Sequence, residues 1–284
     1  MAPIRSHSQA SGPAVPPFES LPADQFGRDA FGRGARLEFA ALSEAGLVRP
    51  HNEDRWRAVP EDGVFVLADG MGGYNAGEVA ADLAVQTACR LIPELAAQTE
   101  VADAMRHALA ACNDRIRDHA AGNRDCLGMG TTIVACLVRD GRLHLAHIGD
   151  SRAYLLHDGH LRRLTRDHSI GQQIADSGAL TEAQVRHLPG RGILTRALGV
   201  EASVSSDCAS CDWQAQDTLL LCSDGLTDLV PDERIGQLLE AGACAGPHEQ
   251  AKALVAAAIA AGGSDNVSVV VVRATGPAGQ EPMH

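Results

Sequence analysis

With 284 residues, of which 45% are hydrophobic, the chain is long enough to bury a full-sized core. Its formal net charge of −12 argues against nonspecific nucleic-acid binding, which requires clustered positive charge. No apolar run approaches the ~20 residues that a membrane helix needs, and the N-terminal segment lacks the apolar core of a signal peptide. We therefore expect a cytoplasmic protein that binds neither nucleic acid nor membranes.

The pattern along the chain predicts one domain between two flexible tails. Residues 1–35 are rich in Pro, Gly, Ser and Ala and show no hydrophobic period, so we expect a flexible N-terminal tail. The domain is predicted over residues 36–274, and residues 275–284 form a short flexible C-terminal tail. The eight cysteines include one CxxC, Cys208 to Cys211, without a second pair to complete a zinc set. We interpret them as structural.

The first half of the domain is predicted to contain two strands, two helices and then four strands. The strands lie at residues 36–43 and 63–69, and the Ala-rich helices at 78–91 and 101–119. Four further strands follow at 131–138, 143–148, 152–156 and 161–165. The dipeptides Asp140-Gly141 and Asp158-Gly159 lie between pairs of these strands and predict tight hairpins.

The second half begins with a polar, partly helical insertion at residues 169–192. Strands are predicted at 203–213 and 217–223, helices at 231–240 and 249–261, and a last strand at 266–273. Consecutive antiparallel strands with helices in two pairs predict an α+β fold. We expect a four-layer αββα sandwich, with two antiparallel sheets flanked by helix pairs.

Four aspartates share one local context, in which a buried strand meets a turn rich in Gly or Ser. They are Asp69, Asp150, Asp224 and Asp265. Each alone is explained by turn chemistry, because Asp and Gly are common turn residues. Together, however, carboxylates gathered at one edge would repel each other unless a cation lay between them. A set of oxygen ligands without His or Cys favours Mg²⁺ or Mn²⁺ over zinc.

A fifth element places an arginine just before an acidic pair. Arg49 precedes Glu53 and Asp54 in the segment GLVRPHNED. Guanidinium is suited to bidentate phosphate binding. An isolated arginine is usually only a surface charge, so this interpretation depends on the neighbouring carboxylates.

Eight segments, in order, resemble the metal-dependent protein phosphatases (the PPM family, type 2C class), and bacterial single-domain members in particular. They are GLVRPHNED (46–54), LADGMGGYNAGEVAA (67–81), GMGTT (128–132), HIGDSRAY (147–154), LTRDHS (164–169), LTRALG (194–199), LLCSDGLTD (220–228) and GGSDNVSVVVV (262–272). The resemblance covers Leu37 to Arg273. It implies a β-sandwich flanked by helices, with a binuclear metal centre at one end.

The resemblance also implies a set of metal ligands. Asp69 would bridge two tightly bound Mn²⁺ or Mg²⁺ ions, and the Gly70 carbonyl would bind one of them. Asp224 and Asp265 would hold the other ion, and Asp54, with or without Glu53, would act through metal-bound water. Asp150 resembles the residue that recruits a weaker third ion together with Asp224 in bacterial members.

The implied reaction is hydrolysis of phosphoserine and phosphothreonine in proteins by a metal-activated water, without a phosphoenzyme. Arg49 would bind the substrate phosphate, and catalysis would rest on Arg49, Asp69 and Asp224. Met71 stands where eukaryotic members often carry a histidine proposed as general acid, so another group must take that role. Residues 169–192 resemble the mobile flap beside the cleft.

Partners and alternatives follow from the same resemblance. We expect a monomer whose partners are phosphoproteins and a cognate bacterial Ser/Thr kinase. His51, His147 and His168 lie in the motifs and could shuttle protons, but we favour backbone hydrogen bonding near the site for each. A pseudophosphatase is disfavoured by the complete ligand set, whereas a phosphohydrolase of small molecules remains open.

Overall fold

The computed structural model describes residues 25–32, 35–72 and 76–275. Its first strand, β1 (Gln25–Gly32), pairs antiparallel with β2 (Ala35–Glu44). This strand lies within the segment predicted as the N-terminal tail, and the low apolar content of residues 25–32 did not indicate a strand there. Residues 1–24 and 276–284, where the rest of both predicted tails falls, lie outside the described residues.

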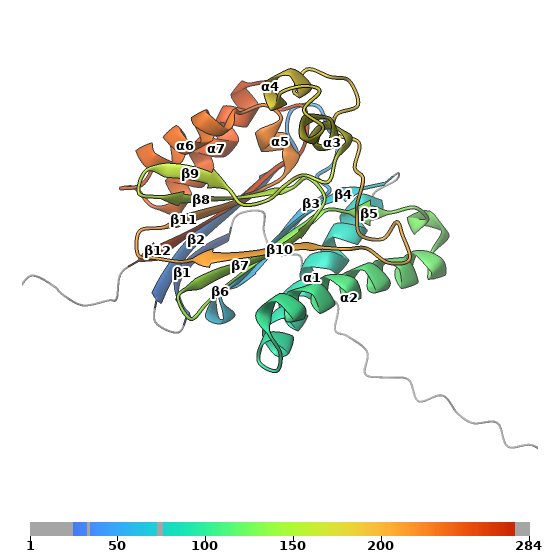
Figure 1. Cartoon of the computed structure of the whole chain (residues 1–284), viewed down its shortest axis with the longest axis horizontal. Coiled ribbons are helices and arrows are strands. Elements are labelled where there is room, and N and C mark those ends of the chain that lie inside the picture. The colour runs from blue at the N-terminus through green and yellow to red at the C-terminus, as the bar shows by residue number, and fades with distance from the viewer. Residues whose placement is uncertain (1–24, 33–34, 73–75, 276–284) are drawn as a thin grey trace, which may run out of the picture.

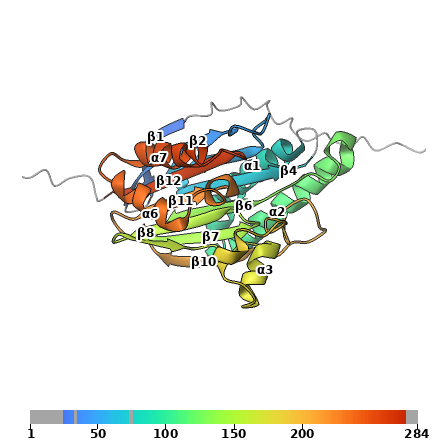
Figure 2. The same cartoon turned by 90° about the horizontal axis from the view of Figure 1, so that it is seen from above.

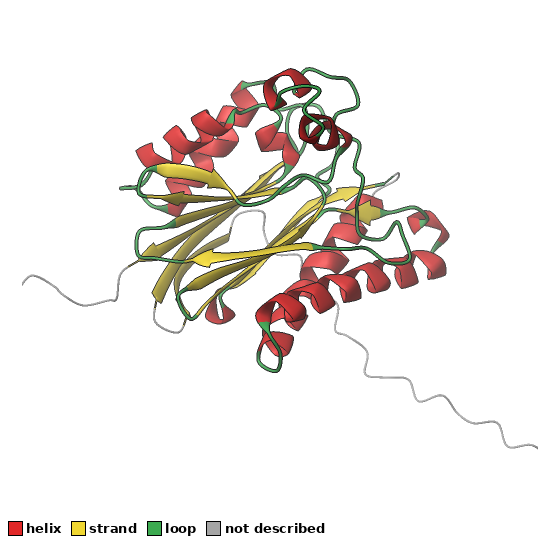
Figure 3. Cartoon of the chain, in the orientation of Figure 1, coloured by secondary structure: helices red, strands yellow, loops and turns green. Residues whose placement is uncertain are grey.

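Two six-stranded antiparallel sheets form the centre of the molecule (Figure 1, Figure 3). The first sheet has the order β1-β2-β12-β11-β8-β9, and the second has the order β10-β7-β6-β4-β3, with β5 paired to β4. The remaining strands are β3 (Asp54–Val59), β4 (Val64–Met71), β5 (Gly130–Thr131), β6 (Ile133–Arg139), β7 (Arg142–Ile148), β8 (Arg152–His157), β9 (His160–Arg163), β10 (Asp207–Asp212), β11 (Thr218–Cys222) and β12 (Val267–Thr275).

One helix pair covers the outer face of each sheet. The pair α1 (Ala76–Ala96) and α2 (Val101–Gly122) packs on the second sheet, and the pair α6 (Asp232–Ala241) and α7 (Pro247–Ala260) packs on the first. Figure 1 and Figure 2 show these pairs on opposite sides of the two sheets. The predicted four-layer αββα sandwich is confirmed. Short helices α3 (Ile170–Asp176), α4 (Glu182–Val185) and α5 (Asp224–Thr227) lie at the end of the sandwich.

The central strands are apolar on both faces because both faces are buried. In β4, Phe65 and Leu67 point into the core between the sheets, whereas Val64, Val66 and Ala68 contact the α1–α2 layer. Strand β12 divides its valines in the same way between the inter-sheet core and the α6–α7 layer. Alternating side chains of a strand point to opposite faces. A continuous apolar run therefore marks a strand with a helix layer behind it.

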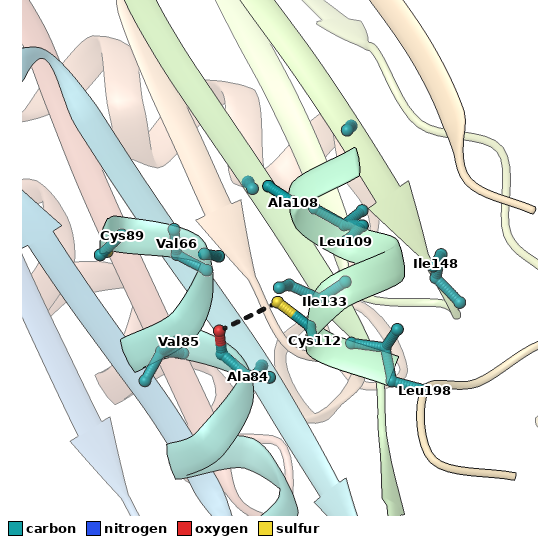
Figure 4. Packing of buried hydrophobic residues seen from close by; sticks show 14 of the residues in the cluster. Val66, Ala84, Val85, Cys89, Ala108, Leu109, Cys112, Ile133, Ile148 and Leu198 are labelled. Carbon is teal, nitrogen blue, oxygen red and sulfur yellow. Dashed lines mark hydrogen bonds between the residues drawn. The ribbon is translucent and has the colours of Figure 1, made fainter. Parts of the chain in front are cut away.

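Small residues allow the α1 and α2 helices to approach closely. Where they meet, the Cys112 Sγ–H donates to the carbonyl oxygen of Ala84 at 3.5 Å (Figure 4). Cys112 is fully buried among apolar neighbours, and burial raises the pKa of its thiol to about 12. All eight cysteines are free; four are buried, as the structural interpretation expects, whereas Cys244 is exposed. Among the described residues, no helix combines the length and apolar character needed to cross a membrane.

Both predicted Asp-Gly hairpins are confirmed, since they join β6 to β7 and β8 to β9. Asp140 and Asp158 have φ values of 52° and 46°, and each following glycine is also left-handed, with φ of 72° or 74°. Two successive left-handed residues give the turn a twist that matches the twist of the two strands it joins. The sequence analysis missed β3 and α5, as it missed β1. Charged residues interrupt the apolar pattern of β3, and α5 is a single helical turn.

Candidate metal centre

Asp54 and Asp69 meet at one end of the second sheet. Asp54 begins β3 and Asp69 lies near the end of β4, and antiparallel pairing sets these two residues directly opposite each other. Non-local pairing thereby joins two acidic motifs that are separate in the sequence. The backbone of Asp69 is held by the next strand, because its N–H donates to Thr132 Oγ1 at 3.0 Å and its carbonyl accepts from Thr131 Oγ1 at 2.8 Å.

Asp224 and Asp265 come from the first sheet. Asp224 follows β11 and opens α5, and Asp265 precedes β12, the strand beside β11. Ser223 connects the two sheets, because its hydroxyl donates to Asp54 Oδ2 at 2.7 Å and accepts from the Ser268 N–H at 3.0 Å. The four carboxylates therefore converge where the ends of both sheets meet.

Asn266 fixes the loop that carries Arg49. Its Oδ1 accepts from the Glu53 N–H at 2.8 Å, and its Nδ2 donates to the carbonyl oxygens of Ala45 and His51 at 3.1 and 2.9 Å. Asn266 and Ser223 both lie inside the recognised motifs, yet their positioning role was not predicted. Their position inside these motifs was the only feature of the sequence that could have indicated this role.

Gly70 lies where the backbone approaches neighbouring backbone very closely. A Cβ at Gly70 would lie 2.2 Å from the Gly77 carbonyl oxygen and 2.8 Å from that of Glu53. Only glycine fits such a position. The close approach that the sequence analysis expected here is present, and Gly70 lines the same cleft as the carboxylates.

Asp150 occupies the turn between β7 and β8 and is 8% exposed. The preceding Gly149 has φ +105°, and a Cβ there would lie 2.6 Å from the Thr132 side chain. His168 holds this turn from two directions. The Gly149 N–H donates to His168 Nδ1 at 3.1 Å, and the His168 N–H donates to the Gly149 carbonyl at 2.9 Å.

His168 also belongs to a cluster with His147 and Asp207 whose ligand atoms lie within 4.8 Å of one another. Because His168 Nδ1 accepts a hydrogen bond, its proton lies on Nε2, which is 3.2 Å from Asp207 Oδ2. Arg196 supplies a positive charge at the same carboxylate, at 2.7 Å from Oδ1. A metal ion needs an unprotonated ring nitrogen as its ligand and is repelled by a guanidinium. This cluster therefore does not suit a metal ion.

The favoured interpretation of two motif histidines is confirmed. His147 Nε2 lies 2.9 Å from the Arg166 carbonyl oxygen, and its ring stacks on His168 at 4.7 Å between centroids. Burial lowers the pKa of both imidazoles, so they are neutral at pH 7. The His51 side chain is exposed.

Burial and mutual repulsion raise the pKa values of Asp54, Asp69, Asp150 and Asp224. Burial is the main cause in each case, raising the pKa of Asp54 to about 6 and that of Asp224 to about 7. The pKa values of Asp69 and Asp150 lie well above the ordinary range. The charges of Asp54 and Asp224 are the next two causes of the raised Asp69 pKa, so both carboxylates lie near Asp69.

These residues fit divalent cations. Among the described residues, Asp54 Oδ1 is buried without a hydrogen-bond partner, and a buried, unpaired carboxylate oxygen is costly. Cations would satisfy such oxygens and remove the repulsion that raises these pKa values. The donor set is carboxylate and carbonyl oxygen, which suits Mg²⁺ and Mn²⁺. Burial also raises the pKa of Glu53, which lines the cleft.

Arg49 faces the same site. Its Nη2 donates to Asp265 Oδ2 at 2.7 Å, and the side chains of the pair are 55% and 34% exposed. That hydrogen bond is the largest cause of a raised Arg49 pKa, so the guanidinium stays charged. Arg49 is thus exposed enough to meet a substrate, while Asp265 holds it over the carboxylates.

The carboxylates open into a cleft of about 870 Å³. Arg49, Met71, Asp69, Asp224 and Asp265 are among its lining residues, with residues 192–197 on another side. A neighbouring cavity of about 440 Å³ lies under the α3–α4 insertion and shares Asp150 and Asp224 with the cleft. The insertion therefore lies beside the site, as the sequence analysis expected. The structure brings all six predicted ligand residues and Arg49 to one end of the sandwich.

Comparison with known proteins identifies relatives across most of the chain. The Protein phosphatase 2C family model matches residues 49–259. The serine/threonine phosphatase stp of Listeria monocytogenes is 36% identical over 236 residues, which cover 81% of this chain and 93% of that protein. The serine/threonine protein phosphatase PstP of Mycobacterium tuberculosis is 40% identical over 235 residues, which cover 83% of this chain and 44% of that longer protein.

Solved structures agree with these relatives. The crystal structure of Mycobacterium tuberculosis PstP superposes with a TM-score of 0.77 at 39% identity, covering 84% of this chain and 99% of that one. A structure of the PstP catalytic domain in complex with two manganese ions gives a TM-score of 0.75 at 38% identity, covering 84% and 98%. A sandwich with carboxylates gathered between its sheet ends is thus the architecture of a metal-dependent phosphatase. The chain belongs to the Protein phosphatase 2C family.

Proposed function

We propose that this chain hydrolyses phosphoserine and phosphothreonine esters in proteins, using Mn²⁺ or Mg²⁺. The observation that carries the proposal is the convergence of buried and half-buried carboxylates from both sheets beside a partly exposed arginine, in a chain of this family. The ligands of two tight ions would be Asp54, Asp69, the Gly70 carbonyl, Asp224 and Asp265. When bound, the ions would supply charge neutralisation and an activated water.

The protein's own residues would orient the substrate. Arg49 would exchange its contact with Asp265 for the phosphate oxygens, because an exposed ion pair is weak and opens readily. Ser223 and Asn266 would hold the ligand-bearing loops in place through the hydrogen bonds described above. Met71 lines the cleft but cannot donate a proton, so protonation of the leaving alkoxide must come from another group.

Asp150 is proposed to bind a weaker third ion together with Asp224. Its support is that Asp150 is buried and Asp224 half-buried, that both line the same cleft, and that the Asp224 charge raises the pKa of Asp150. The positive φ of Gly149 and the clamp by His168 give this turn a defined shape. Few protein ligands and many waters would make the third ion loosely held.

We also propose a cytoplasmic monomer that opposes a Ser/Thr kinase. Eight free cysteines suit a reducing compartment. Few large hydrophobic side chains are exposed among the described residues, and most of these lie near the cleft, which leaves little apolar surface for a dimer. A kinase is required in any case to produce the phosphoproteins on which such an enzyme acts.

The test is hydrolysis of a phosphothreonine peptide with and without chelator. EDTA should abolish turnover, and excess Mn²⁺ should restore it. Asp69→Asn should lower kcat by about 10³-fold, comparable with losing a major electrostatic stabiliser, and should remove tight Mn²⁺ binding in calorimetry. Asp150→Ala should remove only weak binding, and Asp62→Asn, an exposed aspartate away from the cleft, should change neither. Full activity in EDTA, or faster turnover of sugar phosphates than of phosphopeptides, would contradict the proposal.

A further inference from the structure

The exposed large hydrophobic side chains are unevenly distributed over the described residues. Six are more than a third exposed: Leu47, Val48, Leu127, Ile170, Ile193 and Val200. Leu47 and Val48 immediately precede Arg49, and Ile193 and Val200 line the cleft itself. The Ile170 backbone N–H donates to the Ile193 carbonyl, so Ile170 adjoins the same segment. Gathered apolar side chains rimmed by polar ones mark a binding surface.

The segment that carries Ile193 and Val200 is held in a fixed backbone conformation. Its carbonyl and amide groups bond to two separate parts of the domain, the segment 168–170 and Thr131. Ile193 bonds to Ile170, Thr195 bonds to His168, and Leu198 exchanges two backbone hydrogen bonds with Thr131, at 2.8 to 3.1 Å. A backbone restrained at several points loses little further entropy when a ligand binds.

A buried side chain of helix α2 forms hydrogen bonds with the C-terminal end of this segment. Asn113 is 1% exposed, and its Oδ1 accepts from the Gly199 N–H at 2.8 Å while its Nδ2 donates to the Glu201 carbonyl at 3.0 Å. Arg117 adds a bond to the Val200 carbonyl at 3.3 Å. The backbone around Val200 is thus tied down on both sides. The Val200 side chain is nevertheless 55% exposed, and that of Ile193 is 61% exposed.

We propose that Ile193 and Val200, here named the apolar wall, bind an apolar side chain of the protein substrate next to its phosphorylated residue. This inference rests on the proposed function and adds a substrate class to it, namely phosphoproteins with an apolar residue near the phosphorylated serine or threonine. The wall and the carboxylates line one continuous cleft. When the phosphate lies at the carboxylates, the neighbouring residues of the substrate must cross the cleft walls, at about 3.3 Å per extended residue.

An apolar occupant follows from the physical chemistry of the wall. Side chains as large as Ile and Val that are mostly in water gain free energy when an apolar partner covers them. Specificity of this kind is moderate, because burying one apolar side chain on a surface changes kcat/KM by about tenfold. A second copy of the chain is a different occupant, and it would show as concentration-dependent dimerisation.

The experiment uses the Mn²⁺-loaded full chain and a series of phosphothreonine peptides. Each of the three positions on either side of phosphothreonine is Leu in one peptide and Ser in its partner, and the readout is the Leu/Ser ratio of kcat/KM. We expect one position at which this ratio is about tenfold. Ile193→Ser and Val200→Ser should each lower that ratio at least threefold, and the double variant should bring it near one.

Controls separate recognition from folding. Leu127→Ser changes a side chain that is 68% exposed but does not line the cleft, and it should keep the wild-type ratio. Val200→Thr keeps the branched shape and should lower the ratio even if a serine variant melts early. A ratio below twofold at every position, or one unchanged in the variants, overturns the inference while the proposed function stands. If wild type hydrolyses no phosphopeptide, both fall together.

Discussion

Arg49 and Asp265 illustrate how one residue pair can serve two states of the site. The 2.7 Å contact joins a predicted phosphate ligand to a predicted metal ligand. Both side chains are partly exposed, so water screens the attraction and the pair contributes little to stability. The contact instead keeps the guanidinium charged and directed over the carboxylates. Its rearrangement would release Asp265 for a cation and Arg49 for phosphate at the same time.

Arg49→Ala should therefore raise KM for a phosphopeptide by about tenfold or more, because a hydrogen bond between charged groups contributes roughly 1.5–3 kcal/mol. The fall in kcat should be smaller, since the arginine contacts phosphate in both substrate and transition state. Arg90→Ala, an exposed α1 arginine in an i,i+4 pair with Glu94, is the matched control. Steady-state kinetics and Mn²⁺ calorimetry on both variants check this. Weaker Mn²⁺ binding in Arg49→Ala would place Arg49 among the groups that build the metal centre.

At the scale of elements, α2 does more than cover the second sheet. Most of its buried side chains are apolar and pack against α1 and the sheet. Asn113 is the exception, since the oxygen and the nitrogen of its side-chain amide both form hydrogen bonds with the backbone of residues 199 and 201. A buried polar side chain is stable only when it is fully hydrogen-bonded. The helix therefore sets the position of a cleft segment whose residues 199 and 201 lie 86 and 88 residues after Asn113 in the chain.

Asn113→Ala should lower the melting temperature by about 5 °C. It leaves a backbone N–H and a carbonyl without their partner, at a cost of about 1–3 kcal/mol, and about 1 kcal/mol shifts a domain of this size by roughly 2–4 °C. Asn123→Ala, which removes an exposed amide at the end of the same helix, should shift it by less than about 2 °C. Calorimetry of both variants decides the matter. If both variants lower the melting temperature equally, the buried hydrogen bonds of Asn113 contribute no more to stability than the exposed amide of Asn123.

At the scale of the whole molecule, the carboxylates at the end of the sandwich repel one another, and the packing of the apolar core offsets this repulsion. The carboxylates are drawn together by the pairing of β3 with β4 and of β11 with β12, and three apolar layers hold those strands in place. The folded state without cations must keep these groups protonated or accept their repulsion. This links the stability of the domain both to pH and to divalent ions.

In EDTA, the melting temperature should fall as pH rises from 6.5 to 8. Folded pKa values of about 7 for Asp224, and well above the ordinary range for Asp69 and Asp150, exceed the unfolded value of about 3.9. Their contribution is fully present below about pH 3.9 and is lost as pH rises through the folded pKa values. The lowered pKa values of His147 and His168 act in the opposite sense only near and below pH 6.5.

Mn²⁺ should therefore raise the melting temperature more at pH 8 than at pH 6.5, because the cations bind the deprotonated carboxylates. Melting curves with Mn²⁺ and with EDTA at both pH values measure this difference. Asp69→Asn should reduce the Mn²⁺ effect at either pH. Parallel curves with and without Mn²⁺ would show that the carboxylates do not control stability.

The sequence by itself determined the class of fold and the candidate site. Strands such as β4 and β12 are continuous apolar runs because helices cover one face and the other sheet covers the second. The Asp-Gly hairpins were predictable because left-handed backbone at two successive residues strongly selects these residue types. Asp69, Asp150, Asp224 and Asp265 were found because each lies at or beside the end of such a strand. All of these signals are local.

Only the tertiary structure decided which distant residues meet. Strand β12, the last of the described strands, lies between β2 and β11, and the register of β3 on β4 sets Asp54 opposite Asp69. The Ser223–Asp54 contact spans 169 residues, and the Asn266–Glu53 contact spans 213. Such contacts leave no periodicity or turn signal, because their energy depends on burial and geometry that form when the two sheets pack. The same holds for β1, whose ordering depends on its pairing with β2.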